Sequence, residues 1–238
     1  MSSPATLLIP EKTDIEFEQV EAAWRRKGGS VMRLGKYWVK DEQLSSQSIA
    51  IYGNQTFALV LAQIYNVNLL SPDDALIAEM EVKWSKRTIQ LLPVSKIGKA
   101  CFPAFVKPVI PKLFLAGIFY QQELFNDVIT GLQHDELVLM AEIIHDIKGE
   151  ARSYVLQGII LDLAWYEGEG DLSIGYEFLT EFVCAYQDRL PVAVVIDIAF
   201  SEERGWFILE FNGCWGAGLN NCNAEKVIDC IANATIPA

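Results

Sequence analysis

Two carboxylates and an amide near the C-terminal end form the pattern with the clearest chemical use. Glu210 and Asn212 are two positions apart in an apolar segment, so on a strand their side chains lie on the same face. A tight hairpin with the preceding apolar segment would place Asp197 opposite Glu210. Two carboxylates and an amide oxygen are hard ligands that suit Mg²⁺, which commonly bridges to substrate phosphates. The spacing alone leaves two interpretations open, a magnesium site or polar residues at strand ends.

Four basic residues stand beside apolar segments, where a charge needs a partner. Lys107 ends one such segment, Lys112 follows across a short loop, Arg152 enters another segment, and Arg87 closes a short basic cluster. In a chain with an excess of acids, such cations indicate an anionic ligand, and Lys, Arg and Mg²⁺ around a transferring phosphate are what phosphoryl chemistry requires. For each cation taken singly, a solvated charge or an ion pair with one of the 31 acids is the more common alternative.

Other motifs for nucleotide binding or nucleophilic catalysis do not occur in the sequence. The Gly-Lys pairs at 35–36 and 98–99 lack the rest of a P-loop, and no Gly-x-Ser-x-Gly elbow is found. The glycine-rich segment 213–218 does not match the dinucleotide fingerprint and indicates instead a tight turn close to the acids. His134 and His145 are interpreted as surface residues, and the five cysteines as small apolar residues.

The composition excludes several classes of protein. With 19 basic and 31 acidic residues the net charge is −12, which argues against broad binding to nucleic acid. The 238 residues, 51% of them hydrophobic, are enough to bury a core without disulfides. No apolar run is long enough to span a membrane, and the N-terminal residues do not resemble a signal peptide. With an odd number of cysteines and no CxxC pair, the expectation is a cytoplasmic protein with reduced thiols.

The elements that must position these groups fall into two parts. Up to about residue 82, strands and helices alternate as in a small α/β layer. The sequence predicts strands at 7–9, 31–39, 48–53 and 67–70, and helices at 14–27, at 55–66 and from 71–74 onward.

Beyond residue 82, several strands follow one another with flanking helices, which indicates an α+β fold. The sequence predicts helix or turn at 83–92, strands at 102–106, 113–120, 137–144, 192–200 and 206–211, one or two strands in 151–165, and helices at 175–189 and 224–234.

The order of these pieces resembles the ATP-grasp superfamily of carboxylate–amine ligases. The resemblance is greatest for the clade marked by one arginine and two lysines, and it covers about residues 83–238. The layout is also similar to that of the ribosomal-protein glutamate ligases. The segments that carry the resemblance are Lys107-Pro108, a strand leading to Glu142, Lys148-Gly149 through Arg152 to Val155, Asp197, and Glu210-Phe211-Asn212 followed by glycine.

The resemblance implies an ATP-grasp fold, in which two α+β subdomains grip the nucleotide. These subdomains would be residues 83–138 and 139–238, preceded by a small α/β domain at residues 1–82.

The resemblance also implies roles for the basic residues. Lys107 would bind the nucleotide phosphates, and Arg152 would contact the γ-phosphate or the acylphosphate, which makes both catalytic. Arg87 stands where the family usually has its first nucleotide-binding lysine. Lys112 stands where many members have a glycine-rich phosphate loop, shortened here to Val109-Ile110-Pro111. Both departures fit the clade of one arginine and two lysines.

The remaining implied roles concern the adenine and the metal. The segment 140–144, with Glu142 and Ile143, would read the adenine through backbone groups. Asp197, Glu210 and Asn212 would hold one or two Mg²⁺ ions.

The implied reaction uses ATP and Mg²⁺. A substrate carboxylate attacks the γ-phosphate, and an amine then attacks the acylphosphate, giving an amide or peptide bond, ADP and phosphate. Cations neutralise the moving phosphoryl group, and a mobile cover would exclude water.

Two other functions stay open at this stage. The same site could act as a kinase that phosphorylates a hydroxyl. Alternatively, the fold could serve as a non-catalytic interaction module, but the intact set of Asp197, Glu210 and Asn212 argues against this alternative. The carboxylate and amine substrates, whether small molecule, peptide or protein tail, are not readable from the sequence. A homodimer would account for the apolar composition, but its interface is not readable either.

Overall fold

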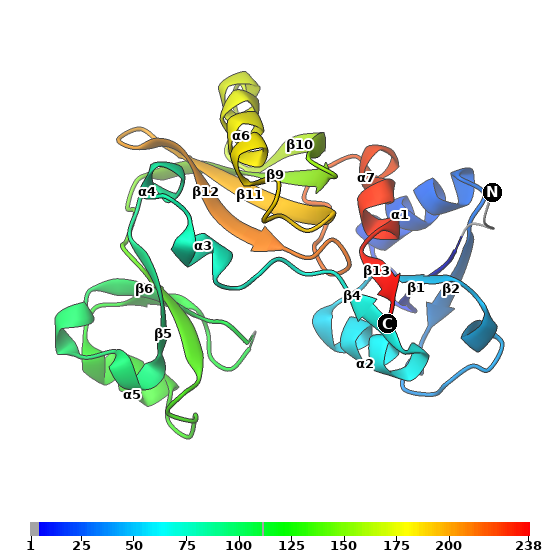
Figure 1. The fold of residues 1–238 in the computed structure, drawn as a ribbon, viewed down its shortest axis with the longest axis horizontal. Helices are drawn as coiled ribbons and strands as arrows, with labels where there is room; N and C mark the ends of the chain where they lie inside the picture. The colour runs from blue at the N-terminus through cyan, green and yellow to red at the C-terminus, as the bar shows by residue number, and fades with distance from the viewer. Residues whose placement is uncertain (1–4, 111) are drawn as a thin grey trace. The chain divides into compact units, whose positions relative to one another are not determined.

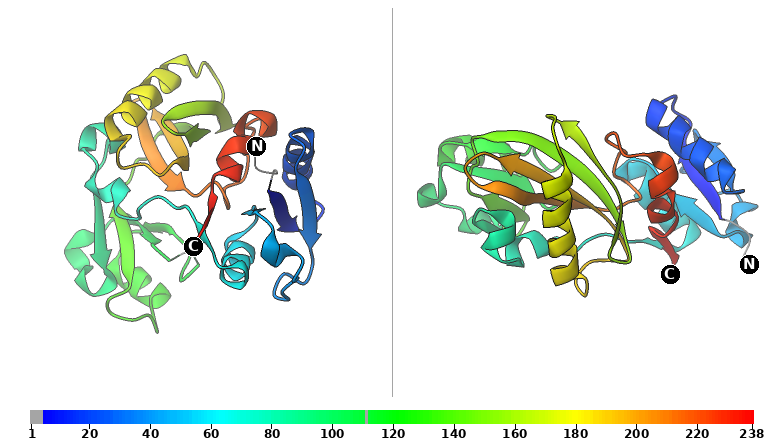
Figure 2. Two further views of the ribbon diagram at one scale, coloured as in Figure 1. Left: turned by 45° about the vertical axis from the view of Figure 1, so that its right-hand side comes forward. Right: turned by 90° about the horizontal axis from the view of Figure 1, so that it is seen from above.

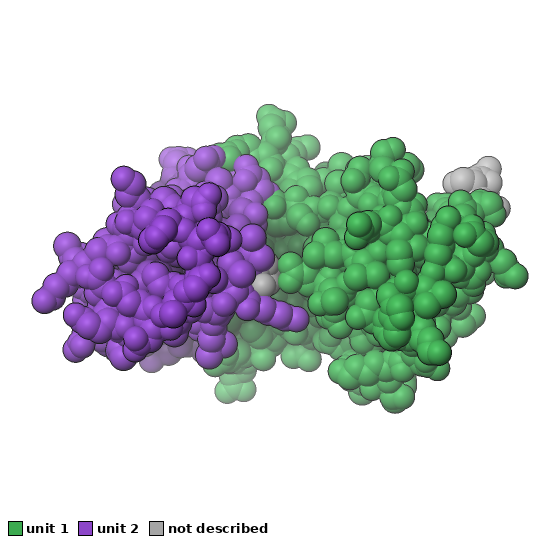
Figure 3. Space-filling view, turned by 90° about the horizontal axis from the view of Figure 1, so that it is seen from below, with its two compact units in different colours: residues 1–72, 149–199, 209–238 green, residues 73–148, 200–208 purple. Residues whose placement is uncertain are grey.

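The structure, a computed structural model, describes residues 5–110 and 112–238. Residues 1–4, which bear on the expectation of no signal peptide, and Pro111 of the short loop lie outside the described residues. The chain divides into two units by its internal contacts (Figure 3). Unit 1 comprises residues 1–72, 149–199 and 209–238, and unit 2 comprises residues 73–148 and 200–208.

Unit 1 begins with a parallel sheet of order β2-β1-β3 (Figure 1). The side chain of Asp14 accepts a hydrogen bond from the backbone N–H of Glu16 and so caps the first helix, while Asn54 caps the second through Phe57. The elements of this part are β1 (Thr6–Pro10), α1 (Ile15–Arg26), β2 (Ser30–Leu34), the 3₁₀ turn η1 (Leu44–Ser46), β3 (Ile49–Ile51), α2 (Gln55–Tyr65) and β4 (Val67–Leu69).

The second sheet has the order β10-β9-β11-β12. Helix α6 packs on it, with the ring of Phe182 stacked 5.8 Å from that of Phe211 on β12. The elements are β9 (Ile147–Leu156), β10 (Ile159–Glu167), α6 (Ser173–Tyr186), β11 (Ala193–Ser201), β12 (Gly205–Asn212), α7 (Ala224–Ala232) and β13 (Thr235–Pro237).

One apolar core joins the two parts of unit 1. Leu7 and Ile9 of β1, Tyr154 of β9, Val195 of β11 and Ile228 of α7 all belong to it and are almost fully buried. Helix α7 also lies beside α1 (Figure 2), and β13 pairs antiparallel with β4. The N-terminal α/β layer therefore completes its core with residues from the C-terminal end of the chain.

Unit 2 is built on an antiparallel sheet of order β5-β8-β6-β7. Its core gathers around Phe125 of α5, whose ring meets those of Phe114 and Phe119 edge-on. The elements are α3 (Leu76–Glu79), α4 (Val82–Ser85), β5 (Ile89–Pro93), η2 (Val94–Lys96), η3 (Lys99–Cys101), β6 (Ala104–Pro108), β7 (Gly117–Phe119), α5 (Gln122–Val128) and β8 (Leu137–Ala141).

Mixed helices and antiparallel sheets confirm the α+β fold class. Most predicted elements are present, but four predictions are wrong in detail. The strand predicted at 31–39 ends at Leu34, and the helix predicted from 71–74 begins only at Leu76. The helix or turn at 83–92 is the short α4 followed by strand β5, and the strand predicted at 113–120 is reduced to β7. Both strand predictions were too long because they counted apolar residues that are exposed, among them Trp38, Val39 and Leu115.

The division into residues 1–82, 83–138 and 139–238 stays a prediction. The two contact-defined units describe a different property, namely which segments pack together. Within the described part of the chain, no helix is long and apolar enough to cross a membrane.

Candidate functional site

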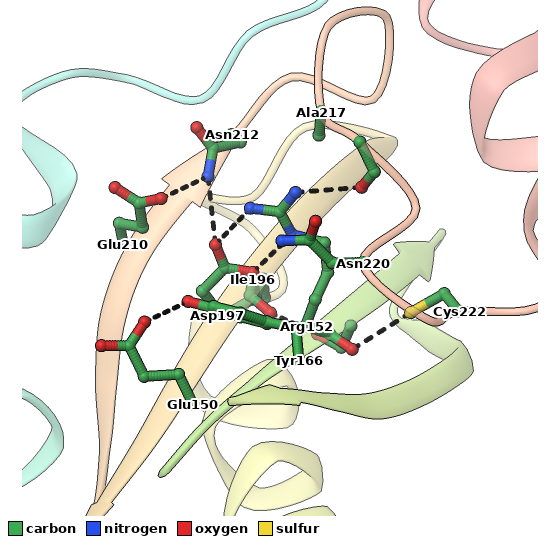
Figure 4. Close-up of polar contacts among 12 residues, drawn as sticks. Glu150, Arg152, Tyr166, Ile196, Asp197, Glu210, Asn212, Ala217, Asn220 and Cys222 are labelled. Carbon is green, nitrogen blue, oxygen red and sulfur yellow. Dashed lines mark hydrogen bonds and ion pairs between the residues drawn. The ribbon is translucent and has the colours of Figure 1, made fainter. Parts of the chain in front are cut away.

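An ion pair buried in unit 1 lies at the centre of the candidate site (Figure 4). Asp197 on β11 has no exposed surface, and Arg152 on the neighbouring strand β9 is 8% exposed. The guanidinium binds the carboxylate in a two-point fork, with Nε 2.8 Å from Oδ1 and Nη2 2.6 Å from Oδ2. A carboxylate in the middle of such an apolar strand needs a partner of this kind, because burying it unpaired would be costly.

The residues predicted from the sequence to converge do so. Asn212 on β12 donates its amide N–H to Glu210, at 3.0 Å from Oε1, and lies 3.4 Å from Oδ2 of Asp197. Strands β11 and β12 are neighbours in the sheet, as the predicted hairpin requires. Asp197, Glu210 and Asn212 therefore form one cluster together with Arg152 (Figure 4).

Burial and neighbouring charge act against each other in this cluster. Burial raises the pKa of Asp197 to about 6, although the hydrogen-bonded guanidinium of Arg152 acts to lower it, and the nearby Glu210 adds to the rise. Burial acts to lower the pKa of Arg152, but the hydrogen bonds and charge of Asp197 outweigh it and raise the pKa above its ordinary value. The guanidinium of Arg152 therefore stays charged, and its charge is paired with the carboxylate of Asp197.

Groups that the sequence analysis did not assign complete the surroundings of Arg152. Its Nη1 donates to the carbonyl of Gly218 at 2.9 Å, and the ring of Tyr166 lies 5.7 Å from the guanidinium carbon. The hydroxyl of Tyr166 donates to Glu150, and that of Tyr154 donates to the carbonyl of Gly218 at 3.1 Å. Glu150, Arg152 and Tyr154 alternate along β9, so the period of two was the signal that could have grouped them.

The donor set fits a hard divalent cation. Two carboxylates within reach of one amide are the ligand types that Mg²⁺ takes. Among the described residues, no group of three or more His, Cys, Asp or Glu is placed to hold a metal ion, so the amide of Asn212 would have to supply the third ligand. In this structure Asn212 points its amide nitrogen at both carboxylates. Turning that amide about its last torsion would bring its oxygen to the same place, so Asp197, Glu210 and Asn212 could hold the ion together.

In unit 2, Arg87 is as buried as Arg152 but is held differently. Its Nη1 donates to the carbonyls of Ser85 and Ile208, each at 3.1 Å, and its guanidinium carbon lies 5.2 Å from the centre of the Phe207 ring. Burial lowers its pKa to about 10, and the nearby charge of Arg204 adds to the decrease. These carbonyls fix the orientation of the guanidinium.

Glu142 and Ile143 follow directly after β8 in unit 2. The carboxylate of Glu142 accepts a hydrogen bond from Arg204 at 2.7 Å, which holds the pKa of Glu142 below its ordinary value. Its backbone N–H donates to the carbonyl of Thr88 at 3.0 Å. The segment thus continues the pairing of β8 before the chain turns away.

The two lysines of unit 2 lie at the end of β6 and in the loop after it. Lys107 is half-buried on the strand, and its charge acts to lower the pKa of Asp74, which burial raises overall. Lys112 is exposed and has a positive φ of 70°. The roles assigned to these lysines, to Arg87 and to Glu142 and Ile143 stay predictions.

Comparison with known proteins connects this geometry to a family. The family model that matches residues 84–230 describes an ATP-grasp domain, family 2 of the clade marked by one arginine and two lysines. No curated protein sequence matches the chain significantly.

Solved structures share the fold at low sequence identity. The chain is similar to an ATP-grasp protein with a RimK domain from Sphaerobacter thermophilus, with a TM-score of 0.61 and 14% identity over 96% of this chain and 98% of that one. It is also similar to a D-alanine–D-alanine ligase from Bacillus anthracis, with a TM-score of 0.57 and 13% identity over 97% and 96%. A third is the N5-carboxyaminoimidazole synthetase from Staphylococcus aureus, with a TM-score of 0.59 and 12% identity over 100% and 79%. These likenesses confirm the ATP-grasp fold.

Proposed function

Because the chain belongs to family 2 of the ATP-grasp clade marked by one arginine and two lysines, we propose that it is an ATP-dependent carboxylate–amine ligase that forms ADP. The observation that carries the proposal is the convergence of Asp197, Glu210 and Asn212 beside the guanidinium of Arg152. Other proteins with this fold support the cofactors, since one was solved with ATP and another with Mg and ADP.

The proposed reaction has two steps. An oxygen of the substrate carboxylate bonds to the γ-phosphorus of ATP while the bond from that phosphorus to ADP breaks. The nitrogen of an amine then bonds to the acyl carbon, phosphate leaves with the electrons of the broken C–O bond, and the amine gives up a proton. Mg²⁺, when bound, supplies positive charge that offsets charge on the transferring phosphoryl group.

The residues of the cluster take separate roles in this proposal. Asp197, Glu210 and Asn212 hold the metal. Arg152 binds the γ-phosphate and then the acylphosphate, because its planar fork suits a phosphate as well as it suits the carboxylate it binds now. The glycine-rich loop after β12 holds the third edge of the guanidinium through the carbonyl of Gly218.

In unit 2 we assign nucleotide-binding roles to the other residues. Lys107 and Lys112 bind phosphates, and Glu142 and Ile143 read the adenine through their backbone groups. Since the N–H of Glu142 already donates to Thr88, its share of that contact falls to its carbonyl. Arg87 contributes a positive charge whose orientation the carbonyls of Ser85 and Ile208 fix.

Binding of Mg²⁺ and ATP is tested by thermal unfolding of the wild type, of Glu210→Gln and of Glu177→Gln. Glu177 is exposed on α6, so its variant controls for the loss of one charge. ATP with Mg²⁺ at ~100 times its dissociation constant is expected to stabilise the wild type by about 2.7 kcal/mol, which is a rise of several degrees in Tm. Glu210→Gln should lose the part of the rise that depends on Mg²⁺, whereas Glu177→Gln should keep it. A wild type that does not respond to any nucleotide would contradict the proposal.

Trapping with hydroxylamine identifies the reaction. The acylphosphate of a ligase is converted to a hydroxamate, whereas a kinase acting on a hydroxyl gives none. ADP release that depends on a supplied carboxylic acid, with hydroxamate formed in equal amount, is the expected result. Phosphate transfer to a hydroxyl without hydroxamate would instead identify a kinase.

A further inference from the structure

One acidic side chain of the N-terminal helix contacts the loop next to the candidate site. Glu16, in the first turn of α1, accepts a hydrogen bond at Oε1 from the backbone N–H of Asn220, at 3.0 Å and across 204 positions of sequence. Its other oxygen, Oε2, lies so close to Gly218 that a Cβ there would be 2.8 Å away. A side chain at position 218 would therefore require the carboxylate of Glu16 to move.

The same short loop holds Arg152. The carbonyl of Gly218 accepts from Arg152 Nη1 at 2.9 Å and from the hydroxyl of Tyr154 at 3.1 Å. Asn220 and Asn221 both have positive φ, 46° and 68°, so the backbone here follows an uncommon path that outside contacts must stabilise. The hydrogen bond from Asn220 to Glu16 is one of those contacts.

Helix electrostatics alone does not account for this contact. An acid in the first turn of a helix is favourable because it faces the positive end of the helix dipole. Glu18 meets that description equally well, since it is in the same turn of α1 and is exposed. Of these two acids, Glu16 is the one that extends to the loop of Gly218, which gives it a use beyond stabilising the helix.

We propose that Glu16 is a positioning residue, which fixes the loop at Gly218 and thereby aims the guanidinium of Arg152. Three hydrogen bonds and a short stretch of backbone make the connection. The N–H of Asn220 donates to Glu16, and the guanidinium of Arg152 donates to the carbonyl of Gly218 and to Asp197. Glu16 makes no contact with substrate in this proposal. Its effect on phosphate binding rests on the function proposed above, and its effect on Arg152 does not.

The first measurement uses the protein without nucleotide. The Nε–H signal of Arg152 in an NMR spectrum, assigned by its loss in Arg152→Lys, reports how firmly the guanidinium is held. Glu16→Ala should shift this signal and speed its exchange with water, while Glu18→Ala should leave it unchanged. Glu16→Gln should leave it near its wild-type position, because its side-chain oxygen still accepts from Asn220. An Arg152 signal that is the same in Glu16→Ala and the wild type would overturn the proposal.

The second measurement gives the consequence for nucleotide binding. Titration with ATP and Mg²⁺ should show a dissociation constant about tenfold larger for Glu16→Ala, which corresponds to ~1.4 kcal/mol. Glu18→Ala should match the wild type and Glu16→Gln should stay within about threefold of it. In an Arg152→Lys background, Glu16→Ala should add little, because the two residues act through one path. If Glu16→Ala weakens nucleotide binding by the same factor in the wild type and in Arg152→Lys, the proposal is overturned.

The two proposals fail in different ways. If the wild type does not bind nucleotide, the proposed function is wrong, and the Arg152 signal still decides whether Glu16 positions the guanidinium. If the wild type binds nucleotide and Glu16→Ala binds it equally well, only the role of Glu16 is wrong. Should Glu16→Ala not fold, the Arg152 signal is measured in Glu16→Lys, which also lacks the acceptor.

Discussion

The two units each contain a buried arginine, and the two arginines differ in what holds them. Arg152 in unit 1 and Arg87 in unit 2 are both 8% exposed. The first binds a carboxylate in a two-point fork, and the second binds two backbone carbonyls and lies over an aromatic ring. Their pKa values move in opposite directions, upward for Arg152 and downward to about 10 for Arg87. At equal burial the pKa shifts are thus opposite, because the carboxylate of Asp197 outweighs burial at Arg152, whereas burial outweighs the charge of Glu142 at Arg87.

The comparison indicates what each unit contributes. In unit 1 the guanidinium of Arg152 is already paired with the carboxylate of Asp197. A phosphate that binds Arg152 must therefore displace this carboxylate, and a metal ion that binds Asp197 must displace the guanidinium. In unit 2 two backbone carbonyls orient the guanidinium of Arg87, and burial is the largest cause of its pKa shift. Different groups therefore hold two equally buried arginines in place.

The largest effect is expected from Arg152→Ala. Removing the guanidinium leaves Asp197 buried without its cation, which costs about 3–5 kcal/mol in the free energy of unfolding. Urea unfolding followed by circular dichroism measures it. Adding Asp197→Asn to the same chain should recover part of the loss, because no unpaired charge is then buried. A loss below about 1 kcal/mol, typical of exposed pairs, would show that the pair is not buried in solution.

A smaller effect is expected from Arg87→Ala. The buried carbonyls of Ser85 and Ile208 lose a hydrogen-bond donor, which costs about 1–3 kcal/mol in the free energy of unfolding. The same unfolding measurement applies, with Lys83→Ala as the control, since its ion pair with Glu81 is exposed and worth about 0–1 kcal/mol. A loss as large as that of Arg152→Ala would remove the contrast between the two units.

Tyr166→Phe should have a milder effect still. The ring near Arg152 is kept and the hydrogen bond from the hydroxyl to Glu150 is lost, which costs about 0.5–1.5 kcal/mol. Thermal unfolding measures this change, and Tyr176→Phe on the exposed side of α6 serves as the control. Greater stability in Tyr166→Phe than in the wild type would contradict the stabilising role of this hydrogen bond.

The smallest effect concerns a carboxylate of unit 2. The hydroxyl of Ser201 and the backbone N–H of Glu203 hold the pKa of Asp146 below its ordinary value of 3.8. A carboxylate with a lowered pKa stabilises the fold above its unfolded pKa, and this contribution is lost as the pH falls through the lower, folded value. Asp146→Asn should therefore flatten the pH dependence of stability below about pH 4. If the free energy of unfolding changes with pH equally steeply in Asp146→Asn and in the wild type below about pH 4, the prediction is wrong.

The cluster of Asp197, Glu210 and Asn212 could be predicted because it depends only on local rules. Alternation along a strand and a short hairpin suffice to bring the three side chains together. The bond between Arg152 and Asp197 was beyond these rules, because it requires β9 to lie next to β11 and that order is set by the whole sheet. The contact of Glu16 with Asn220 spans 204 positions and has no local signal at all.

The fold shows the same division between local and distant information. Helices α1 and α2 were predicted closely because their apolar residues recur at helical spacing within one short segment. Strand β5 was read as helix or turn because its five residues gain their conformation from pairing with β8 rather than from their own pattern. The shared core of unit 1 also joins distant segments, so composition alone could not locate it.

Strand β4 cannot pair with β13 until nearly the whole chain has been synthesised. Strand β4 meets β13 in register from Leu69 to Val67, and the hydroxyl of Thr235 accepts from the backbone N–H of Ile51 at 3.0 Å. About 165 residues separate these segments, which at ~5–20 residues per second takes a ribosome roughly 10–30 s. Throughout that interval the nascent N-terminal layer has an unpaired strand edge and an incomplete apolar core. Exposed strand edges and apolar surface promote aggregation, so slower translation would lengthen the time during which the nascent chain can aggregate.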